Sequence, residues 1–258
     1  MFRCGEVETM RRESALVVML KYPEPGKVKT RLVPPLTEHE AADLYRCFVE
    51  DTFSRLQPLS RTGAPGGPVR IYGAFTPAER REAVAALLPA GTPLISQRGR
   101  DLGERLSTIF DGIIDSHYEM VVIIGSDSPD IPLAYIQDAL GLLNEKRGRV
   151  VLGPSEDGGY YLIAMDSPHT IPFERVSWGS DTVLNETIEG CRRGGIEVVL
   201  LPTWRDVDRV EDLEPLINNS RLPATSRFIN KNLGHIIGIA DSIGVKGGID
   251  LKHEGRGG

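Results

Sequence analysis

The sequence predicts an α/β domain built around a mostly parallel, mixed β-sheet that is flanked by helices. Short apolar runs rich in β-branched residues alternate along the chain with longer segments that show helical periodicity. Most of the runs are apolar at consecutive positions, which is typical of strands covered on both faces. Because parallel strands need crossover connections, the alternation predicts right-handed strand–helix–strand units within one sheet.

Each expected strand corresponds to one apolar run. The runs are 15–20 (ALVVML), 69–74 (VRIYGA), 120–125 (MVVIIG), 149–153 (RVVLG), 160–165 (YYLIAM) and 196–201 (IEVVLL). Their separation by longer polar or periodic segments fits a sheet whose strands are joined mainly by helices.

The expected helices have recognisable start signals. Thr37 and Glu40 have the spacing of a capping box, and an apolar stripe at helical spacing follows them. Thr76, Pro77 and Glu79 have the same pattern, with proline at the first helical position. Further helices are expected near 102–116, 132–146, 181–193 and 210–218.

The composition is that of one folded domain with additional residues at its ends. The chain of 258 residues is 40% hydrophobic and 26% charged, so it can bury a substantial core. We expect an N-terminal extension over 1–13, the domain over 14–220 and a partly flexible C-terminal tail over 221–258.

Charge and apolar run length argue against two classes of protein. A net charge of −6 argues against a nucleic-acid-binding protein, which needs a broad basic surface. The longest apolar runs are far shorter than the ~18 residues of a membrane span. The polar N-terminus does not read as a signal peptide, and three scattered cysteines do not form a disulfide framework or a zinc site. We therefore expect a cytoplasmic protein.

Positive charge is concentrated in one loop, although the whole chain is acidic. The segment KYPEPGKVKTRL (21–32) follows an expected strand and contains Lys21, Lys27, Lys29 and Arg31. Lysines on a surface loop are commonly only solvated. Here Gly26 would let the backbone approach a ligand, and the cations could bind diphosphate oxygens. Because ligands of open α/β sheets bind at the carboxyl ends of strands, this loop is a candidate anion site.

Carboxylates follow other expected strands. Asp127, in GSDSPDIP, comes directly after the strand 120–125 and has no capping role, so we favour binding of Mg²⁺ or Mn²⁺. Asp130 is either a second such ligand or the N-cap of the next helix. In DVDRVEDL, Asp208 and Glu211 have capping-box spacing, whereas Asp206 has no such explanation. Either aspartate of this loop could be a further metal ligand.

Two glycine-containing segments are weaker candidates. In SEDGGYYL, the pair Gly158 and Gly159 favours a hairpin turn, because glycine supplies positive φ. The alternative is close approach to an acceptor, with Glu156 or Asp157 as the base.

The second of these segments, QRGRDLGERL, carries several arginines. Arg100 and Asp101 could help to form a nucleotide pocket, although an N-cap at Asp101 explains that residue equally well. The motifs of a P-loop, of a dinucleotide-binding Rossmann fold and of a serine-hydrolase elbow do not occur in the sequence.

Six segments together resemble a known group of proteins. In chain order they are KYPEPGKVKTRLVPPLT, DLGERL, GSDSPDIP, GPSEDGGYYLIAM, WGSDTVL and DVDRVEDL. The set resembles the bacterial glycosyltransferase-A-like (GT-A-like) proteins related to the arsenosugar-biosynthesis glycosyltransferase, in the nucleotide-diphospho-sugar transferase superfamily. The relatives of this group include the molybdenum-cofactor nucleotidyltransferases and the phospholactate guanylyltransferases. The resemblance covers about residues 15–215. It departs from the group in the wider spacing of Asp127 and Asp130 and in WGSD where WGT is commoner.

This resemblance implies a single GT-A-like domain that binds a nucleotide through Mg²⁺ or Mn²⁺. By position, the donor phosphates would contact Lys27, Lys29 and Arg31. The metal would be held by Asp127 and by Asp208 or Asp206. The acceptor would be bordered by Asp157, Gly158, Gly159 and Trp178.

The function that follows is a metal-dependent transferase with a nucleotide-activated donor. We expect glycosyl transfer from an NDP-sugar to a small acceptor, with Asp157 or Glu156 as the base if the reaction inverts the anomeric carbon. The first alternative is a nucleotidyltransferase that joins an NTP to a phosphorylated acceptor and releases pyrophosphate. The second is a non-catalytic nucleotide-binding protein on the same fold. The expected partners are small molecules, namely an NDP-sugar or NTP donor and an acceptor.

Overall fold

The described part of the chain forms one seven-stranded sheet. The structure is a computed structural model that describes residues 13–62, 67–114, 116 and 118–234. The strand order is β3-β2-β1-β4-β6-β5-β7. Strand β6 is antiparallel to both of its neighbours, and all other pairs are parallel. The sheet is therefore mixed and mostly parallel, as the sequence predicts.

The strands agree closely with the apolar runs. Their bounds are Ser14–Lys21 (β1), Val69–Thr76 (β2), Leu94–Ser96 (β3), Met120–Gly125 (β4), Arg149–Pro154 (β5), Tyr160–Met165 (β6) and Glu197–Leu200 (β7). Strand β3 was not predicted, because it has only three residues and lies half-buried at the sheet edge. The predicted hairpin is formed by β5 and β6.

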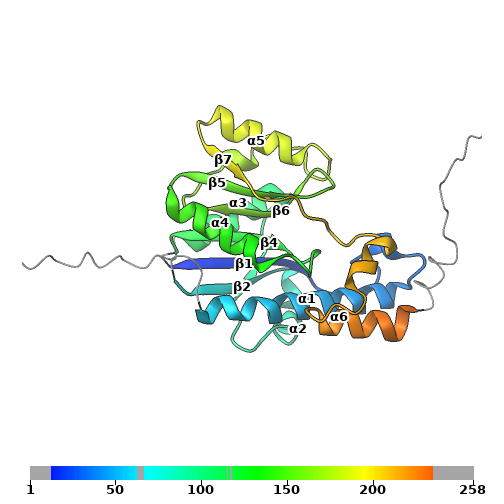
Figure 1. Ribbon diagram of the computed structural model, residues 1–258. Coiled ribbons are helices and arrows are strands. Elements are labelled where there is room, and N and C mark those ends of the chain that lie inside the picture. Colours follow the sequence, from blue (N-terminus) through cyan, green and yellow to red (C-terminus); the bar gives the residue numbers. More distant parts are fainter. Residues whose placement is uncertain (1–12, 63–66, 115, 117, 235–258) are drawn as a thin grey trace, which may run out of the picture.

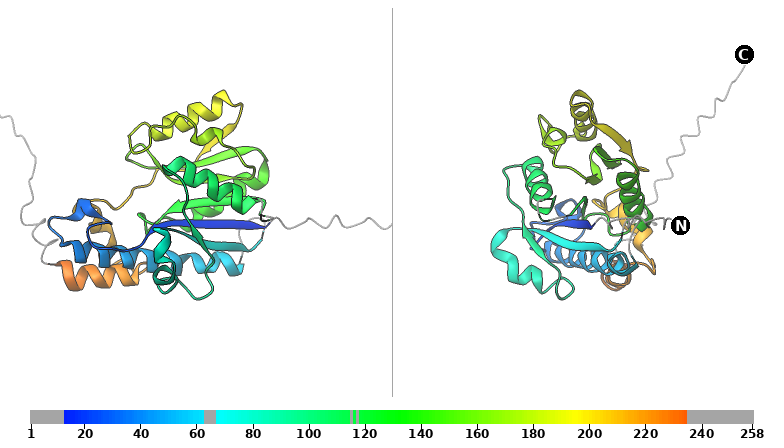
Figure 2. Two further views of the ribbon diagram at one scale, coloured as in Figure 1. Left: turned by 180° about the vertical axis from the view of Figure 1, so that it is seen from behind. Right: turned by 90° about the vertical axis from the view of Figure 1, so that its left-hand side faces the viewer.

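Helices cover both faces of the sheet (Figures 1 and 2). Their bounds are Glu38–Thr62 (α1), Arg81–Ala85 (α2), Leu102–Ile114 (α3), Leu133–Glu145 (α4), Val183–Arg193 (α5) and Pro223–Phe228 (α6). Short 3₁₀ segments are Thr30–Leu32 (η1), Ala78–Arg80 (η2), Ile171–Phe173 (η3) and Val210–Leu216 (η4), and a π-helical turn is Ile229–Leu233 (η5).

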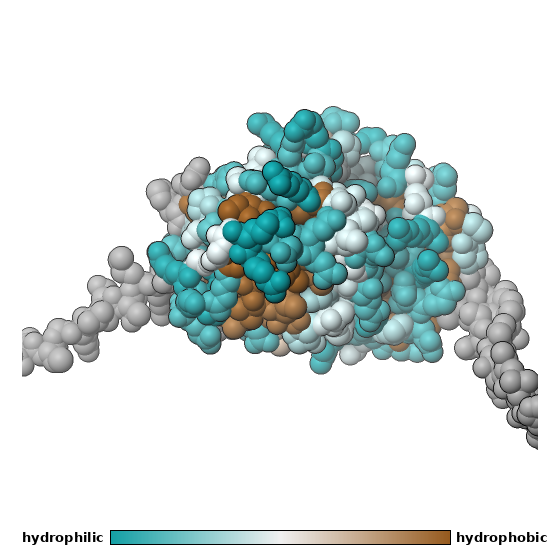
Figure 3. Space-filling view, turned by 90° about the horizontal axis from the view of Figure 1, so that it is seen from above, coloured by the Kyte–Doolittle hydropathy of each residue, from teal (hydrophilic) through white to brown (hydrophobic). Residues whose placement is uncertain are grey.

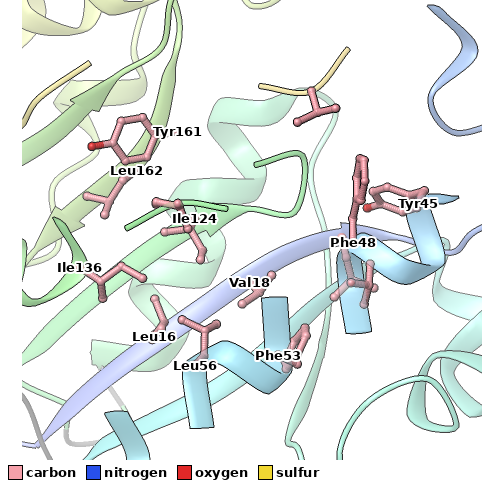
Figure 4. Close-up of a cluster of buried hydrophobic side chains, with 14 of the residues drawn as sticks. Leu16, Val18, Tyr45, Phe48, Phe53, Leu56, Ile124, Ile136, Tyr161 and Leu162 are labelled. Carbon is pink, nitrogen blue, oxygen red and sulfur yellow. The ribbon is translucent and has the colours of Figure 1, made fainter. Parts of the chain in front are cut away.

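The alternation of side chains along each strand divides the core into two layers. On β1, Leu16 and Val18 pack in the same cluster as Phe48 and Leu56 of α1 (Figure 4). This cluster also contains residues of α4, of η5, of α2 and of the segment after α2. The intervening positions of β1, such as Val17, pack with residues of α3 and α5 on the other face. Burial on both faces explains why the strand sequences are continuously apolar.

The two capping boxes predicted at threonines have different outcomes. At the start of α1, Thr37 Oγ1 accepts the N–H of Glu40 at 3.2 Å, and Glu40 accepts the N–H of Thr37 at 2.8 Å. The box at Thr76 does not form. Thr76 instead extends β2 opposite Lys21 and accepts the N–H of Tyr22. Sheet pairing therefore replaces the predicted cap, and only the short segments η2 and α2 follow.

The packed chain continues beyond the predicted boundary at residue 220. Helix α6 lies along α1 (Figures 1 and 2), and Leu222, Ile229 and Leu233 are buried in the same cluster as α1. The buried carboxylate of Asp51 on α1 accepts the first N–H groups of α6, from Ala224 at 3.1 Å and Thr225 at 2.8 Å. Residues 1–12 of the predicted extension and residues 235–258 of the predicted tail lie outside the described residues.

The surface and the helix lengths also bear on the predicted class of protein. The face that carries α5 and β7 is mostly hydrophilic, and its hydrophobic residues gather mainly around a polar cluster on the left of the view (Figure 3). Among the residues that the structure describes, no helix combines the length and the apolar character needed to cross a membrane.

Candidate functional site

The basic and acidic loops meet at one edge of the sheet. Strands β1, β4, β5 and β7 run in the same direction, so the loops that follow them lie at a common end. Two cavities of about 490 Å³ and 630 Å³ open there. We call the smaller the first cavity and the larger the second cavity. Both are lined by Lys21, Lys29, Asp127 and Asp206, so they adjoin.

Lys29 is the cation at the centre of this edge. Its Nζ contacts a carboxylate oxygen of Asp127 and lies 3.2 Å from Oδ1 of Asp208. Only 2% of its side chain is exposed. Burial lowers the pKa of Lys29, but the charges of Asp127 and Asp208 outweigh that effect and raise the pKa above its ordinary value. Lys29 is therefore held as an ammonium ion between two loops, after β4 and after β7.

Asp208 faces Lys29 because another residue caps the helix that follows. The predicted box of Asp208 and Glu211 does not form. Instead Asp212 accepts the N–H groups of Asp208 at 2.9 Å and Arg209 at 2.7 Å. The Asp208 carboxylate is thus left for Lys29 and for Arg31, whose Nη1 lies 2.8 Å from Oδ2.

Asp206 lies at the same edge of the sheet and lines both cavities. It accepts hydrogen bonds from Ser128 Oγ at 2.6 Å and from Ser155 Oγ at 3.2 Å. Burial raises the pKa of Asp206, and the nearby charges of Asp127 and Asp157 act in the same direction. Asp206 therefore joins the loops after β4, β5 and β7, and its two oxygens already have hydroxyl partners.

Asp127 and Asp208 fit a divalent cation. Both contact the same ammonium group, so their oxygens converge on one cationic position. No three His, Cys, Asp or Glu side chains in the described part of the chain gather as a metal-binding group. Carboxylates from two residues, with remaining ligands from phosphate and water, are the usual protein contribution to a Mg²⁺ site.

The glycine turn between β5 and β6 forms one wall of the second cavity. Asp157 and Gly159 line that cavity, and Asp157 Oδ1 accepts the N–H of Gly159 at 2.9 Å. Gly158 has φ of 89° and packs against the backbone of Asp181, with its carbonyl accepting the N–H of Leu184 at 2.9 Å. Glu156 is exposed and lines neither cavity.

Trp178 forms another wall of the second cavity. Its indole packs against Gly103, where a Cβ atom would lie only 2.7 Å away, and meets the ring of Tyr160 edge-on. Glu186 holds the loop that carries Trp178, because its carboxylate accepts the N–H of Ser177 at 2.5 Å. This hydrogen bond lowers the pKa of Glu186.

Four predicted residues have other roles in the structure. Asp101 caps α3 by accepting the N–H of Glu104 at 2.9 Å, and Arg100 pairs with Glu104; neither lines a cavity. Gly26 has φ of 73° in the turn of the basic loop and packs against Glu38 rather than lining a cavity. Asp130 is neither an N-cap nor a cavity residue, because Trp204 and Arg205 donate to its carboxylate.

Sequence reasoning missed a polar group in the first cavity. Gln97 follows β3, lines this cavity and donates from Nε2 to the carbonyls of Leu20 at 3.2 Å and Ala74 at 2.8 Å. These bonds fix the amide so that its oxygen is left as an acceptor. The signal was a polar amide at the end of a short apolar run, LISQ.

Comparisons with known proteins concern the fold and the family of the chain. A family model described as "Uncharacterized protein conserved in bacteria (DUF2064)" matches residues 62–180. The crystal structure of a protein from Desulfovibrio desulfuricans G20, named "putative nucleotide-diphospho-sugar transferase", has 38% sequence identity and a TM-score of 0.74 and covers 86% of this chain and 95% of that chain.

A more distant likeness shows the fold alone. A cytidylyltransferase from Leptospira borgpetersenii serovar Hardjo-bovis (strain JB197) has 13% identity and a TM-score of 0.51, with 90% of this chain and 96% of that chain covered. No curated protein matches the sequence.

Proposed function

The chain belongs to the family of the nucleotide-diphospho-sugar transferase-like protein of Desulfovibrio desulfuricans G20, and from this premise we propose that it is a metal-dependent transferase that uses a nucleotide-activated donor. The observation that carries the proposal is the contact of Lys29 with both Asp127 and Asp208 between two cavities. A basic loop and a carboxylate pair that meet in this way suit a polyphosphate bound together with a cation.

The donor occupies the first cavity in this proposal. Gln97 accepts an N–H of the base, because its own amide hydrogens are already used by backbone carbonyls. The diphosphate lies toward the basic loop, where Lys21 and Lys27 line the cavity. A divalent cation held by Asp127 and Asp208 would supply charge neutralisation at the leaving diphosphate.

The acceptor occupies the second cavity. Trp178 offers an apolar wall, and Asp157 lies at the cavity with no cation paired to it among the described residues. Asp157 accepts the proton of an attacking hydroxyl in glycosyl transfer from an NDP-sugar, which is the reaction we propose first. Glu156 is a weaker candidate for the base, because it lies outside this cavity.

Nucleotidyl transfer remains the second candidate. The observation that favours it is the number of cations at the site, since Lys21, Lys27 and Arg31 accompany Lys29 and suit a triphosphate as well as a diphosphate. The two reactions differ in their products. NDP released from an NDP-sugar indicates glycosyl transfer, whereas pyrophosphate released from an NTP indicates nucleotidyl transfer.

A thermal-shift screen tests the proposal. The panel contains UDP-glucose, GDP-mannose, UTP, CTP, GTP and ATP, each with and without Mg²⁺ or Mn²⁺. At least one nucleotide should raise the melting temperature in a metal-dependent manner, because a ligand that binds the native state stabilises it by mass action. Asp127→Asn should lose the metal-dependent part of the shift. A panel without any shift would contradict the proposal, and a shift without product in the two assays would favour the non-catalytic alternative.

A further inference from the structure

Lys29 differs from the other cations of the basic loop in its surroundings. Its side chain is 2% exposed, whereas that of Arg31 is 70% exposed and Lys27 is also exposed. Its backbone is left-handed, with φ of 48°, which is uncommon for a residue with a side chain. The loops that bear its partners are joined as well, because Val207 donates its N–H to the carbonyl of Asp127 at 3.0 Å. The ammonium group is thus built into a closed arrangement.

We propose that Lys29 occupies the place of the divalent cation in the nucleotide-free protein and must leave Asp127 and Asp208 before these carboxylates can hold a metal ion. The inference rests on the proposed function, since it concerns the order in which that same site is filled. Because the Lys29 ammonium group competes for the same two carboxylates, the protein should bind a metal ion only weakly when no nucleotide is present.

The physical reason is the balance of charge around the buried ammonium group of Lys29. The ammonium group of Lys29 leaves the two carboxylates with a net charge of −1, whereas a divalent ion added beside that group would turn the charge to +1. The ammonium group and the metal ion would also repel each other, because both would contact the same carboxylate oxygens and the Lys29 side chain is only 2% exposed. A displaced ammonium group needs another anion close to the same loop. Donor phosphates lying along Lys21 and Lys27 supply that anion, so binding of the nucleotide releases the carboxylate pair for the metal. Two ligands linked in this way strengthen each other's binding.

The test measures Mn²⁺ binding to the nucleotide-free full-length protein by electron paramagnetic resonance of the free ion. Lys29→Met should bind Mn²⁺ more tightly than the wild type by on the order of tenfold, the size of an ordinary coupling between two ligands. Lys29→Gln should behave similarly, which guards against a folding defect of either variant; circular dichroism checks the fold of both. The double variant Lys29→Met with Asp127→Asn should return to weak binding.

The matched control is Lys27→Gln. It removes one positive charge from the same loop but from an exposed residue that lines only the first cavity, so Mn²⁺ affinity should stay near that of the wild type. Equal Mn²⁺ affinities of the wild type and both Lys29 variants would overturn the inference. So would an equal gain in Lys27→Gln, because the effect would then be one of general charge. These outcomes need no nucleotide, so they are separate from the thermal-shift test of the proposed function.

Discussion

At the scale of single residues, Gly158 is the position where backbone geometry and the site depend most directly on each other. Its φ of 89° is unfavourable for other residues, and a Cβ atom there would lie 2.1 Å from the backbone oxygen of Asp181. We predict that Gly158→Ala lowers the free energy of unfolding by about 2 kcal/mol or more, because backbone strain and a steric clash add together. Urea denaturation measures the change.

Gly179 provides the matched control for this prediction. Its φ of 88° is almost the same, but a Cβ atom would meet nothing within 4 Å. Gly179→Ala should therefore cost only the strain, about 1 kcal/mol. If the two variants lost equal stability, the contact between the β5–β6 turn and Asp181 would not constrain the second cavity.

Single residues of the site differ in how far the sequence could predict them. Asp127 comes two residues after β4 and Lys29 lies in the loop that follows β1, and the structure brings them together. The choice between Asp206 and Asp208 stayed open because it depends on Asp212, which takes over the cap and frees Asp208. Gln97 was missed because its orientation comes from carbonyls of two other strands, a relation that no local pattern contains.

At the scale of elements, the N-terminus of α3 gives a prediction on pH. Glu104 accepts from the side chain and the backbone N–H of Arg100, and these bonds lower the pKa of Glu104 to about 2. Folding thus favours its ionised form. The resulting stabilisation is present above the ordinary carboxyl pKa and is lost as the pH falls from there toward about 2. An NMR titration of the Glu104 carboxyl carbon should show this low value.

The control for that titration is Arg100→Gln. It removes the guanidinium bonds but keeps the backbone N–H, so the pKa of Glu104 should rise part of the way to its ordinary value. An unchanged titration of Glu104 in this variant would contradict the assigned cause.

Elements with long periodic or continuously apolar sequences were predicted well, because burial alone determines them. Helix α1 and strand β4 are examples. The errors fall where a local signal competes with tertiary pairing. Thr76 has the pattern of an N-cap, but the hydrogen bonds of β2 with β1 extend the strand through it. Strand β3 is too short to show any period and forms only beside β2.

At the scale of the whole molecule, the C-terminal boundary decides how much of the chain the domain needs. The sequence placed the boundary at 220, because the residues beyond it show little periodicity. In the structure, Leu222, Ile229 and Leu233 are at most 1% exposed and pack in the α1 cluster. Asp51, itself 1% exposed, depends on the N-terminus of α6 for its hydrogen bonds. These contacts make the segment 222–233, which contains α6 and η5, part of the domain.

We therefore predict that a chain ending at residue 220 is strongly destabilised relative to one ending at residue 234. Burial of each large apolar side chain contributes about 1.5–3 kcal/mol, and three such losses approach the total stability of an ordinary domain. The buried carboxylate of Asp51 would also lose its two N–H donors in α6, which adds to the loss of stability. The urea midpoints of the two chains, followed by circular dichroism, measure the difference. If the shorter chain cannot be purified, Ile229→Ala tests the same packing, and it should lower the free energy of unfolding by about 2–5 kcal/mol. Equal midpoints for the chains ending at 220 and 234, or an Ile229→Ala variant as stable as the wild type, would show that α6 is dispensable and that the domain ends where the sequence placed it.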